Sequence, residues 1–267
     1  MGDAGAANRR WADLLARWAV PEELLAAAPE SPYFFDPELF TAAADEAVSR
    51  GEDTFSDAVA REALPSGGTV LDVGAGAGAA SLRLAGGAAR LVAVDASREL
   101  LDAFSARAGR MNVESLVIEG RWPDIAAAAP IADVVVCHHV VYNVADLGAF
   151  AAALTTHAAR RVVVELTTQH PMAWMAPYWE AMHGLRQPDG PTVEDAVEVL
   201  TAMGVEVAQR RWSRRVQMIG EADRDMTAKI ARRLCLSADR HAALSQLLDE
   251  VPPPAEREVA TLWWAPG

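Results

Sequence analysis

The residues best suited to chemistry in this sequence stand in a short glycine-rich run. Between Val70 and Ser81 the chain reads Val-Leu-Asp-Val-Gly-Ala-Gly-Ala-Gly-Ala-Ala-Ser, so that an apolar strand leads into Gly74, Gly76 and Gly78. Because glycine lacks a side chain, the backbone can turn sharply there and a ligand can lie against it, facing the amides of a helix N-terminus. The run predicts a nucleotide-cofactor loop that opens a helix.

The spacing of this run permits two adenosine cofactors. Gly74-x-Gly76-x-x-Ala79 fits the dinucleotide fingerprint, and Asp95 lies 21 residues beyond Gly74 at the end of the next predicted strand, where an acid can hold a ribose diol. Both NAD and S-adenosylmethionine present such a ribose. Asp72 favours S-adenosylmethionine, because a carboxylate inside the first strand can organise the loop and attract the positive charges of a methionine-type ligand.

A second set of polar side chains follows the fourth predicted strand. His138, His139 and Tyr142 lie where ligands collect in open α/β sheets, at the carboxyl edge. Methyl transfer from a sulfonium is an in-line displacement, which needs alignment and exclusion of water, and a hydroxyl acceptor also needs a base. A histidine suits that task, and His170 and His183 are further candidates. We expect His139 and Tyr142 to act in catalysis and His138 to line the cofactor; a structural histidine bonded to backbone is the alternative for each.

Five apolar runs of strand length position these residues, and helical stretches separate them. They span 69–73, 91–95, 116–119, 134–138 and 162–166, and two later strands are predicted at 205–212 and 258–264. Strands alternating with helices predict a parallel sheet covered on both faces. Residues 1–65 have helical character and are predicted to form an N-terminal cap, so the second unit is 66–267, interrupted by insertions at 167–192 and 221–254.

The acceptor is expected to meet side chains from the cap and the first insertion. Tyr33 and Phe34 stand in a loop broken by prolines, while His170 and Trp174 belong to the insertion after the fifth strand. Glu165 ends that strand and could bind a polar acceptor. The alternatives are aromatic packing on the sheet edge and an ion pair of Glu165 with Arg160 or Arg161.

From about residue 66 onward the chain resembles class I S-adenosylmethionine-dependent methyltransferases. The run 70–78 resembles that family's first motif, and Val-Ala-Val-Asp-Ala-Ser at 92–97 resembles its second. The resemblance implies a Rossmann-like α/β fold whose seven-stranded sheet is mostly parallel, with the antiparallel last strand beside the fifth. The cofactor contacts it implies are Asp72, Gly74, Ala75, Gly76, Gly78, Asp95, Ala96, Gly120, Arg121, Trp122 and His138.

Two features depart from the family pattern. Many relatives carry Gly-Asp after the third strand, whereas this chain has Gly120-Arg121, so Trp122 stacking is the candidate replacement for the acidic contact to adenine. The last two strands, which normally form a tight hairpin, are separated by helical sequence. The candidate roles of that helical region are substrate binding and homodimer formation.

The composition argues against several other classes of protein and kinds of site. A net charge of −13 argues against general nucleic-acid binding, and the two cysteines cannot form a disulfide framework or a cysteine-based zinc site. Lys229 is the only lysine, and Ala79-Ala80-Ser81 stands where a Walker loop needs Gly-Lys-Ser/Thr. No metal site, signal peptide or membrane span is predicted, and we expect a cytoplasmic protein.

The sequence therefore predicts an S-adenosylmethionine-dependent methyltransferase acting on a small-molecule acceptor. The alternatives are an NAD-dependent oxidoreductase and a cofactor-binding protein without transfer activity. The acceptor and the atom that receives the methyl group cannot be read from the sequence.

Overall fold

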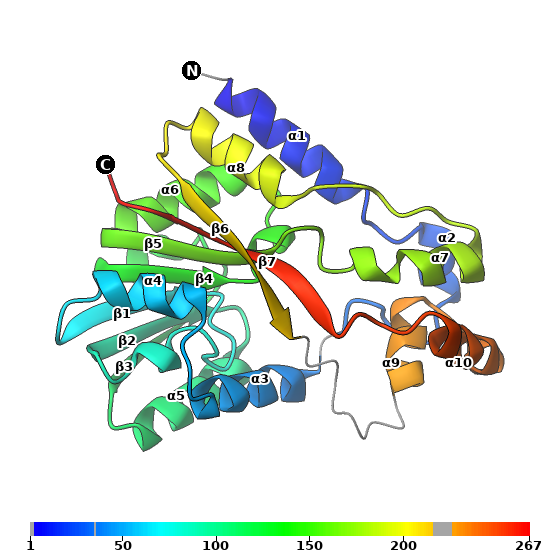
Figure 1. Ribbon diagram of the computed structural model, residues 1–267, viewed down its shortest axis with the longest axis horizontal. Coiled ribbons are helices and arrows are strands. Elements are labelled where there is room, and N and C mark those ends of the chain that lie inside the picture. The colour runs from blue at the N-terminus through cyan, green and yellow to red at the C-terminus, as the bar shows by residue number, and fades with distance from the viewer. Residues whose placement is uncertain (1–2, 35, 216–225) are drawn as a thin grey trace.

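The centre of the molecule is a seven-stranded sheet. The computed structural model describes residues 3–34, 36–215 and 226–267, and its strand order is β3-β2-β1-β4-β5-β7-β6 (Figure 1). The strands are β1 (Gly68–Val73), β2 (Ala88–Asp95), β3 (Glu114–Glu119), β4 (Ala132–His138), β5 (Ala158–Thr167), β6 (Ala208–Arg215) and β7 (Glu256–Trp264). Strands β1 to β5 pair in parallel, and β7 runs antiparallel between β5 and β6. The predicted fold class is confirmed, including the place and direction of the last strand.

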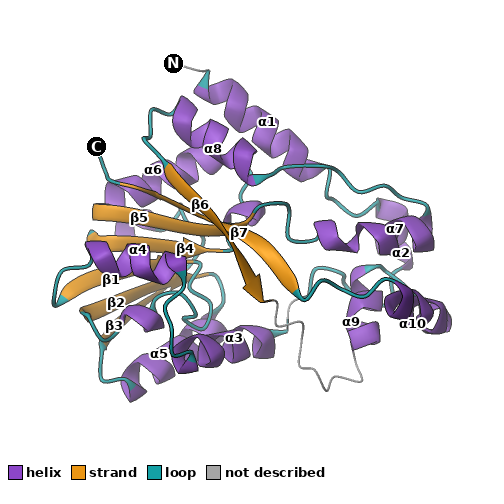
Figure 2. Ribbon diagram, viewed as in Figure 1, coloured by secondary structure: helices purple, strands orange, loops and turns teal. Residues whose placement is uncertain are grey.

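Helices cover both faces of the sheet, as continuous apolar strands require. On one face α1 (Ala4–Ala16), α6 (Leu147–His157) and α8 (Val193–Ala202) pack together and enclose the larger core cluster with β4, β5 and β7 (Figure 2). On the other face α4 (Phe55–Ala63) and α5 (Arg98–Arg110) enclose a second cluster with β1 and β2. In α5 the buried residues Leu100, Leu101, Phe104 and Ala108 recur at helical spacing. The carboxyl edge of the sheet is left for the connections between these layers.

The predicted helix after the glycine run is absent from the structure. Its place is taken by turns and one short 3₁₀ helix, η1 (Leu82–Leu84), before β2 begins. Asp72 on β1 binds both the hydroxyl and the amide of Ser81, which draws the chain down onto the strand. Gly86 and Gly87 then end the segment after only a few residues. The sequence expectation of a helix N-terminus facing the cofactor is therefore wrong.

The N-terminal helices do not form one cap. Helix α1 packs on α6 and α8, α3 (Pro37–Ser49) contacts α5 and η1, and α4 lies against β4, β5 and β7. The hydroxyls of Ser56 on α4 and Thr261 on β7 are 2.7 Å apart in the interior, so α4 belongs to the sheet sandwich. Only α2 (Glu22–Ala27) lies with the helices of the later insertions.

A separate helical lobe stands at one end of the molecule (Figure 1). It comprises α2, α7 (Ala176–His183), α9 (Met226–Arg233) and α10 (His241–Glu250), and its own core includes Tyr178, Trp179, Ile230, Leu234 and Leu244. Both predicted insertions contribute to it, although 221–225 fall outside the described residues. The remaining short helices are η2 (Ala126–Ala128), η3 (Val141–Asn143), η4 (Ala173–Met175) and η5 (Ala238–Arg240). Among the helices described, none has the length and apolar character needed to cross a bilayer.

Candidate functional site

The glycine run forms a loop that other residues could not adopt without strain. Gly74, Gly76 and Gly78 have φ values of 73°, 52° and 100°, all in the left-handed region. A Cβ at Gly74 would lie 2.3 Å from Cγ2 of Val140, and one at Gly78 would lie 2.6 Å from Cδ1 of Leu82. The loop therefore needs glycine for its backbone conformation and for close packing against the segment after β4.

Asp95 ties this loop to the end of β2. Its Oδ2 accepts a hydrogen bond from the Gly76 amide at 2.8 Å, and its Oδ1 accepts one from the Ser97 amide at 2.8 Å. A carboxylate oxygen can accept a second hydrogen bond, so both oxygens keep capacity for ligand hydroxyls. Ala75 is buried behind the loop, and Ala96 is exposed beside the carboxylate.

Asp72 is the buried acid beneath the loop. Its Oδ2 accepts from the Ser81 hydroxyl at 2.6 Å and from the Ser81 amide at 3.2 Å, while Oδ1 has no partner among the described residues. Burial raises the pKa of Asp72 to about 7, although the two bonds from Ser81 act in the opposite direction. The unpaired oxygen and the glycine cradle fit a ligand with a positively charged group, which a methionine-type cofactor supplies.

The segment after β3 fulfils only part of the expectation. Gly120 has φ 151°, and its amide donates to the Asp95 carbonyl, which brings the ends of β2 and β3 together. Arg121 is exposed. Trp122 is a core side chain that donates to the Phe150 carbonyl and packs edge-on against His157 at 4.9 Å. Trp122 therefore packs in the core, and its stacking on adenine stays a prediction.

A polar cluster is assembled at the carboxyl ends of β4 and β5. His138 pairs in register with Glu165, and the backbone amide of His139 donates to the Glu165 carbonyl at 2.7 Å. His139 has φ 60°, a strained value for a residue other than glycine, which turns its side chain back toward Glu165. Nε2 of His139 is 3.0 Å from Oε1 of Glu165. The sequence thus identified two members that the fold brings into contact.

Arg214 is the member that sequence reasoning missed. Its NH1 donates to Glu165 Oε1 at 2.9 Å and lies 3.1 Å from Nε2 of His139. Arg214 stands among several basic residues in the sequence, at 210, 211, 214 and 215. The available signal was its place near the end of a strand that finishes at the same sheet edge. The expected partners Arg160 and Arg161 instead pair with Asp133 and Glu62, so the alternative pairing of Glu165 was wrong.

Electrostatics in the cluster favour an ionised Glu165. The Glu165 side chain is 1% exposed, whereas His139 is 38% exposed. Burial would raise the pKa of Glu165, but His138, His139 and Arg214 together hold it below its ordinary value. Burial also lowers the pKa of His138, despite the attraction of Glu165, and Nε2 of His138 has no partner among the described residues. A buried carboxylate therefore faces an accessible imidazole.

Tyr142 and His170 make packing and hydrogen-bond contacts in this arrangement. The Tyr142 hydroxyl donates to the Thr167 carbonyl at 2.8 Å, and burial raises its pKa. Its ring stacks on Trp11 and meets the edge of His170. His170 also stacks on Trp18 at 3.9 Å and accepts a hydrogen bond from the Met172 amide. Burial lowers the pKa of His170 to about 4. Both residues hold α1 and the loop after it against the segments that follow β4 and β5. The catalytic role of Tyr142 and the substrate role of His170 stay predictions.

The other expected substrate residues lie on the helical lobe. The Tyr33 hydroxyl accepts from the Val20 amide, and the guanidinium of Arg232 lies 4.7 Å from the Phe34 ring. Trp174 packs against Tyr178. The described contacts do not bring these aromatic rings to His139. His183, a further base candidate, contacts the Leu234 carbonyl within the same lobe.

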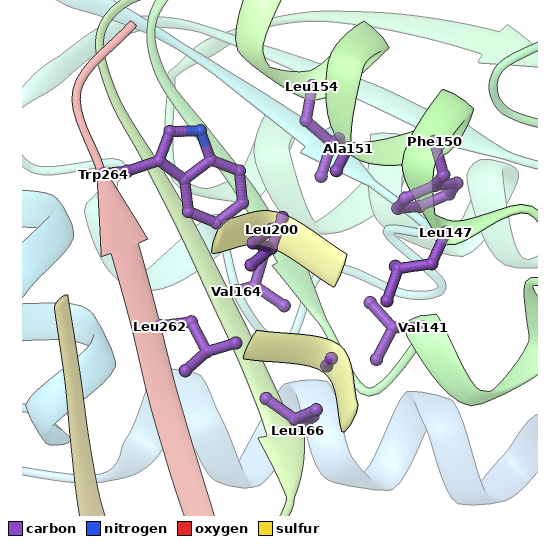
Figure 3. A pocket seen from close by; sticks show the side chains of 11 residues that line it. Val141, Leu147, Phe150, Ala151, Leu154, Val164, Leu166, Leu200, Leu262 and Trp264 are labelled. Carbon is purple, nitrogen blue, oxygen red and sulfur yellow. The ribbon is translucent and has the colours of Figure 1, made fainter. Parts of the chain in front are cut away.

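The cavities lie away from this cluster. One, of about 10 Å³, is enclosed by apolar side chains of α6, α8, β5 and β7 (Figure 3). That is room for about one water molecule among groups that offer it no hydrogen bonds, so the cavity is a packing defect. Another lies on the surface between α1 and α8. In the described parts of the chain, no group of three or more His, Cys, Asp or Glu side chains is arranged to hold a metal ion.

Comparison with known proteins places this geometry in a family. Residues 70–163 match the family model described as a methyltransferase domain. The matched segment, about a third of the chain, is similar to a methyltransferase domain. It includes the glycine loop, Asp95, His138 and His139, and ends before Glu165 and Arg214. Over this segment the resemblance to class I S-adenosylmethionine-dependent methyltransferases is confirmed, and S-adenosylmethionine is the cofactor that the family implies.

Solved structures share the fold of the methyltransferase domain at low sequence identity. YcgJ from Bacillus subtilis is 16% identical, with 79% of this chain and 98% of that chain covered at a TM-score of 0.54. A proposed methyltransferase from Bacillus halodurans is 14% identical (78% and 95% covered, TM-score 0.52), and YjhP from E. coli is 17% identical (86% and 100% covered, TM-score 0.51). No curated protein matches the sequence. These structural similarities support the fold and do not identify the methyl acceptor.

Proposed function

We propose that the methyltransferase domain transfers the methyl group of S-adenosylmethionine to a hydroxyl group of a small-molecule acceptor. The observation that carries this proposal is the 3.0 Å contact between His139 Nε2 and the buried carboxylate of Glu165 at the carboxyl edge. An imidazole held by an ionised carboxylate is suited to general-base catalysis. A hydroxyl needs such a base because its proton has to leave as the oxygen–carbon bond forms, whereas an acceptor that is already deprotonated does not.

The cofactor would lie across the glycine loop. We assign its methionine part to Asp72 and the backbone of Gly74–Gly78, and its ribose to Asp95. The adenine would lie near the backbone of Gly120 and Arg121, with His138 at the sulfonium end. When bound, the cofactor supplies an electrophilic methyl group that leaves a neutral thioether.

The residues of the cluster perform the proton transfer. An ionised Glu165 accepts hydrogen bonds only, so we place a proton on Nε2 of His139, which leaves the Nδ1 lone pair for the acceptor. As the new oxygen–carbon bond forms, the acceptor proton passes to Nδ1 and the imidazolium is stabilised by Glu165. The helical lobe and the loop with Tyr33 and Phe34 would exclude water and select the acceptor. The division of the chain into a helical unit at 1–65 and a Rossmann-like unit at 66–267 stays a prediction.

Thermal unfolding separates the cofactor alternatives. At 100 times its dissociation constant a ligand adds about 2.7 kcal/mol to the free energy of unfolding. We expect S-adenosylhomocysteine to raise the melting temperature by several degrees and NADH to leave it unchanged. A shift with NADH alone would establish the oxidoreductase alternative and refute the proposal.

Transfer itself is tested with methyl-labelled S-adenosylmethionine and a panel of small phenols, enols and alcohols. We expect His139→Gln to reduce transfer by about 10²-fold or more while cofactor binding is retained. His241→Gln on α10 is the matched control, because His241 stands on the helical lobe. Cofactor binding without transfer to hydroxyl, amine or thiol acceptors would favour a binding protein.

A further inference from the structure

Arg214 reaches the polar cluster from a strand that is not adjacent to it. Strand β6 pairs with β7, and Arg214 stands opposite Arg257, beyond the point at which β5 ends with Thr167 opposite Val259. Its side chain therefore has to extend back over the carboxyl edge to meet Glu165. It is 29% exposed, while the carboxylate that it meets is 1% exposed.

Two polar groups meet at one carboxylate oxygen. Oε1 of Glu165 is 2.9 Å from Arg214 NH1 and 3.0 Å from His139 Nε2, and NH1 and Nε2 are 3.1 Å apart. Nε2 cannot both donate to Glu165 and accept from Arg214. Because a carboxylate oxygen only accepts, donation from Nε2 to Glu165 is the arrangement that satisfies the shorter contact. The guanidinium charge then lies against the imidazole ring without a hydrogen bond to it.

This arrangement determines whether the His139 ring carries one proton and keeps a lone pair, or carries two protons and has none. A second proton on the ring would place a positive charge beside Arg214, and like charges at this distance disfavour the charged form. Glu165 acts in the opposite direction. Without the guanidinium, an uncompensated buried anion would face the ring and favour the imidazolium, which has no lone pair to accept a proton.

The other charged groups near His139 do not replace Arg214. His138 follows the same strand and is buried, and Asp57 on α4 is the acid that acts on His138 from the opposing helix. An additional acid on that side would favour protonation of the imidazoles. Arg214 is thus the described cation that contacts both Glu165 and the ring.

We propose that Arg214 is a positioning residue that keeps His139 neutral, with Nε2 protonated and Nδ1 free, by neutralising Glu165. This inference rests on the proposed function, since a neutral His139 matters only if it accepts the acceptor's proton. It predicts that the arginine acts through its charge and not through packing alone.

The test measures the protonation state of His139 by NMR of protein carrying ¹⁵N-labelled histidine, with the signals assigned by His139→Gln. At neutral pH we expect one protonated and one lone-pair nitrogen in the wild type. In Arg214→Gln we expect both nitrogens protonated, with the pH of half-protonation raised by at least one unit. Arg214→Lys should retain the wild-type pattern. Arg215→Gln, the next residue on the same strand and on its opposite face, is the matched control.

A second variant keeps the test decisive if Arg214→Gln folds poorly. Glu165→Gln/Arg214→Gln removes both charges and should return the ring to the neutral form, because the anion that favours imidazolium is gone. A neutral ring in a folded Arg214→Gln variant, or an imidazolium in the double variant, would overturn the inference. Binding of S-adenosylhomocysteine is measured on the same samples. Failure of the wild type to bind S-adenosylhomocysteine would refute the proposed function. The NMR pattern tests the role of Arg214 independently of that result.

Discussion

Replacement of Asp72 by Asn should remove a large part of the pH dependence of stability. Burial raises the pKa of Asp72 from 3.8 to about 7, so the folded protein holds a proton that the unfolded chain has released. A group with a raised folded pKa contributes stability that is fully present below the unfolded pKa and is lost as pH rises through the folded pKa. The slope is about 1.4 kcal/mol per pH unit near pH 5 and falls as pH passes 7, so the loss between pH 5 and pH 8 amounts to about 2.7 kcal/mol.

The assay is urea unfolding of the wild type and Asp72→Asn at pH 5 and pH 8. Asn cannot ionise and can still accept a hydrogen bond from Ser81. The loss of unfolding free energy between the two pH values should therefore be smaller in the variant by about 2.7 kcal/mol. Asp249→Asn, at an exposed position on α10, controls for removal of one surface charge.

The change in unfolding free energy between pH 5 and pH 8 is compared between the two proteins. Groups that titrate alike in both proteins contribute equally to the two changes and therefore cancel. A difference below about 1 kcal/mol would refute the argument that burial of Asp72 disfavours its ionised form. Saturating S-adenosylhomocysteine should reduce the pH dependence of the wild type, because the ligand's ammonium group would favour ionised Asp72. An unchanged profile with the ligand bound would show that the ammonium binds elsewhere.

Three further predictions concern the loop and the stacked rings. Asp95→Ala should weaken S-adenosylhomocysteine binding by about tenfold or more in calorimetry, because hydrogen bonds to a charged group are lost; unchanged affinity would contradict the placement of the ribose. Gly74→Ala should reduce the free energy of unfolding by about 2–4 kcal/mol, from its positive φ and the overlap with Val140, whereas Gly86→Ala has open space and should change it by less than about 1 kcal/mol. The pKa of His170 is lowered to about 4, so its stabilising contribution is present above the unfolded pKa and is lost as pH falls toward 4. His170→Phe should lose less stability than the wild type between pH 7 and 4.5 in urea unfolding, and equal losses would contradict burial as the cause.

Local sequence patterns predicted the sheet because each strand's apolar run has to be buried whatever its partners are. The same patterns fail after the glycine run, where small residues predict a helix start. There the Asp72–Ser81 bonds and the early glycine pair leave only η1. Strand β6 was predicted at 205–212 and is found at Ala208–Arg215, which extends it to the residue that reaches Glu165.

Side-chain roles were predicted less well than strands. His139 and Glu165 were identified because strand ends of a parallel sheet share an edge. Tyr142, His170 and Trp122 stand equally close to strand ends, yet their rings are turned into the packing of α1 and α6. No spacing rule distinguishes a ring that faces a ligand from one that faces a helix, because the difference depends on which distant segment packs there.

The sequence by itself predicted the fold, which is confirmed, and the cofactor class, which the family match implies. The glycine loop and the acids at 72 and 95 follow from backbone conformations and spacings that act within one βαβ-like unit, and they can be read without knowing the rest of the chain. Only the tertiary structure decided which groups surround His139. Its partners come from β5 and β6, 26 and 75 residues further along the chain (165 − 139 and 214 − 139), and β6 reaches the cluster past the inserted β7. Contacts across such distances depend on strand order and register, which no local pattern records.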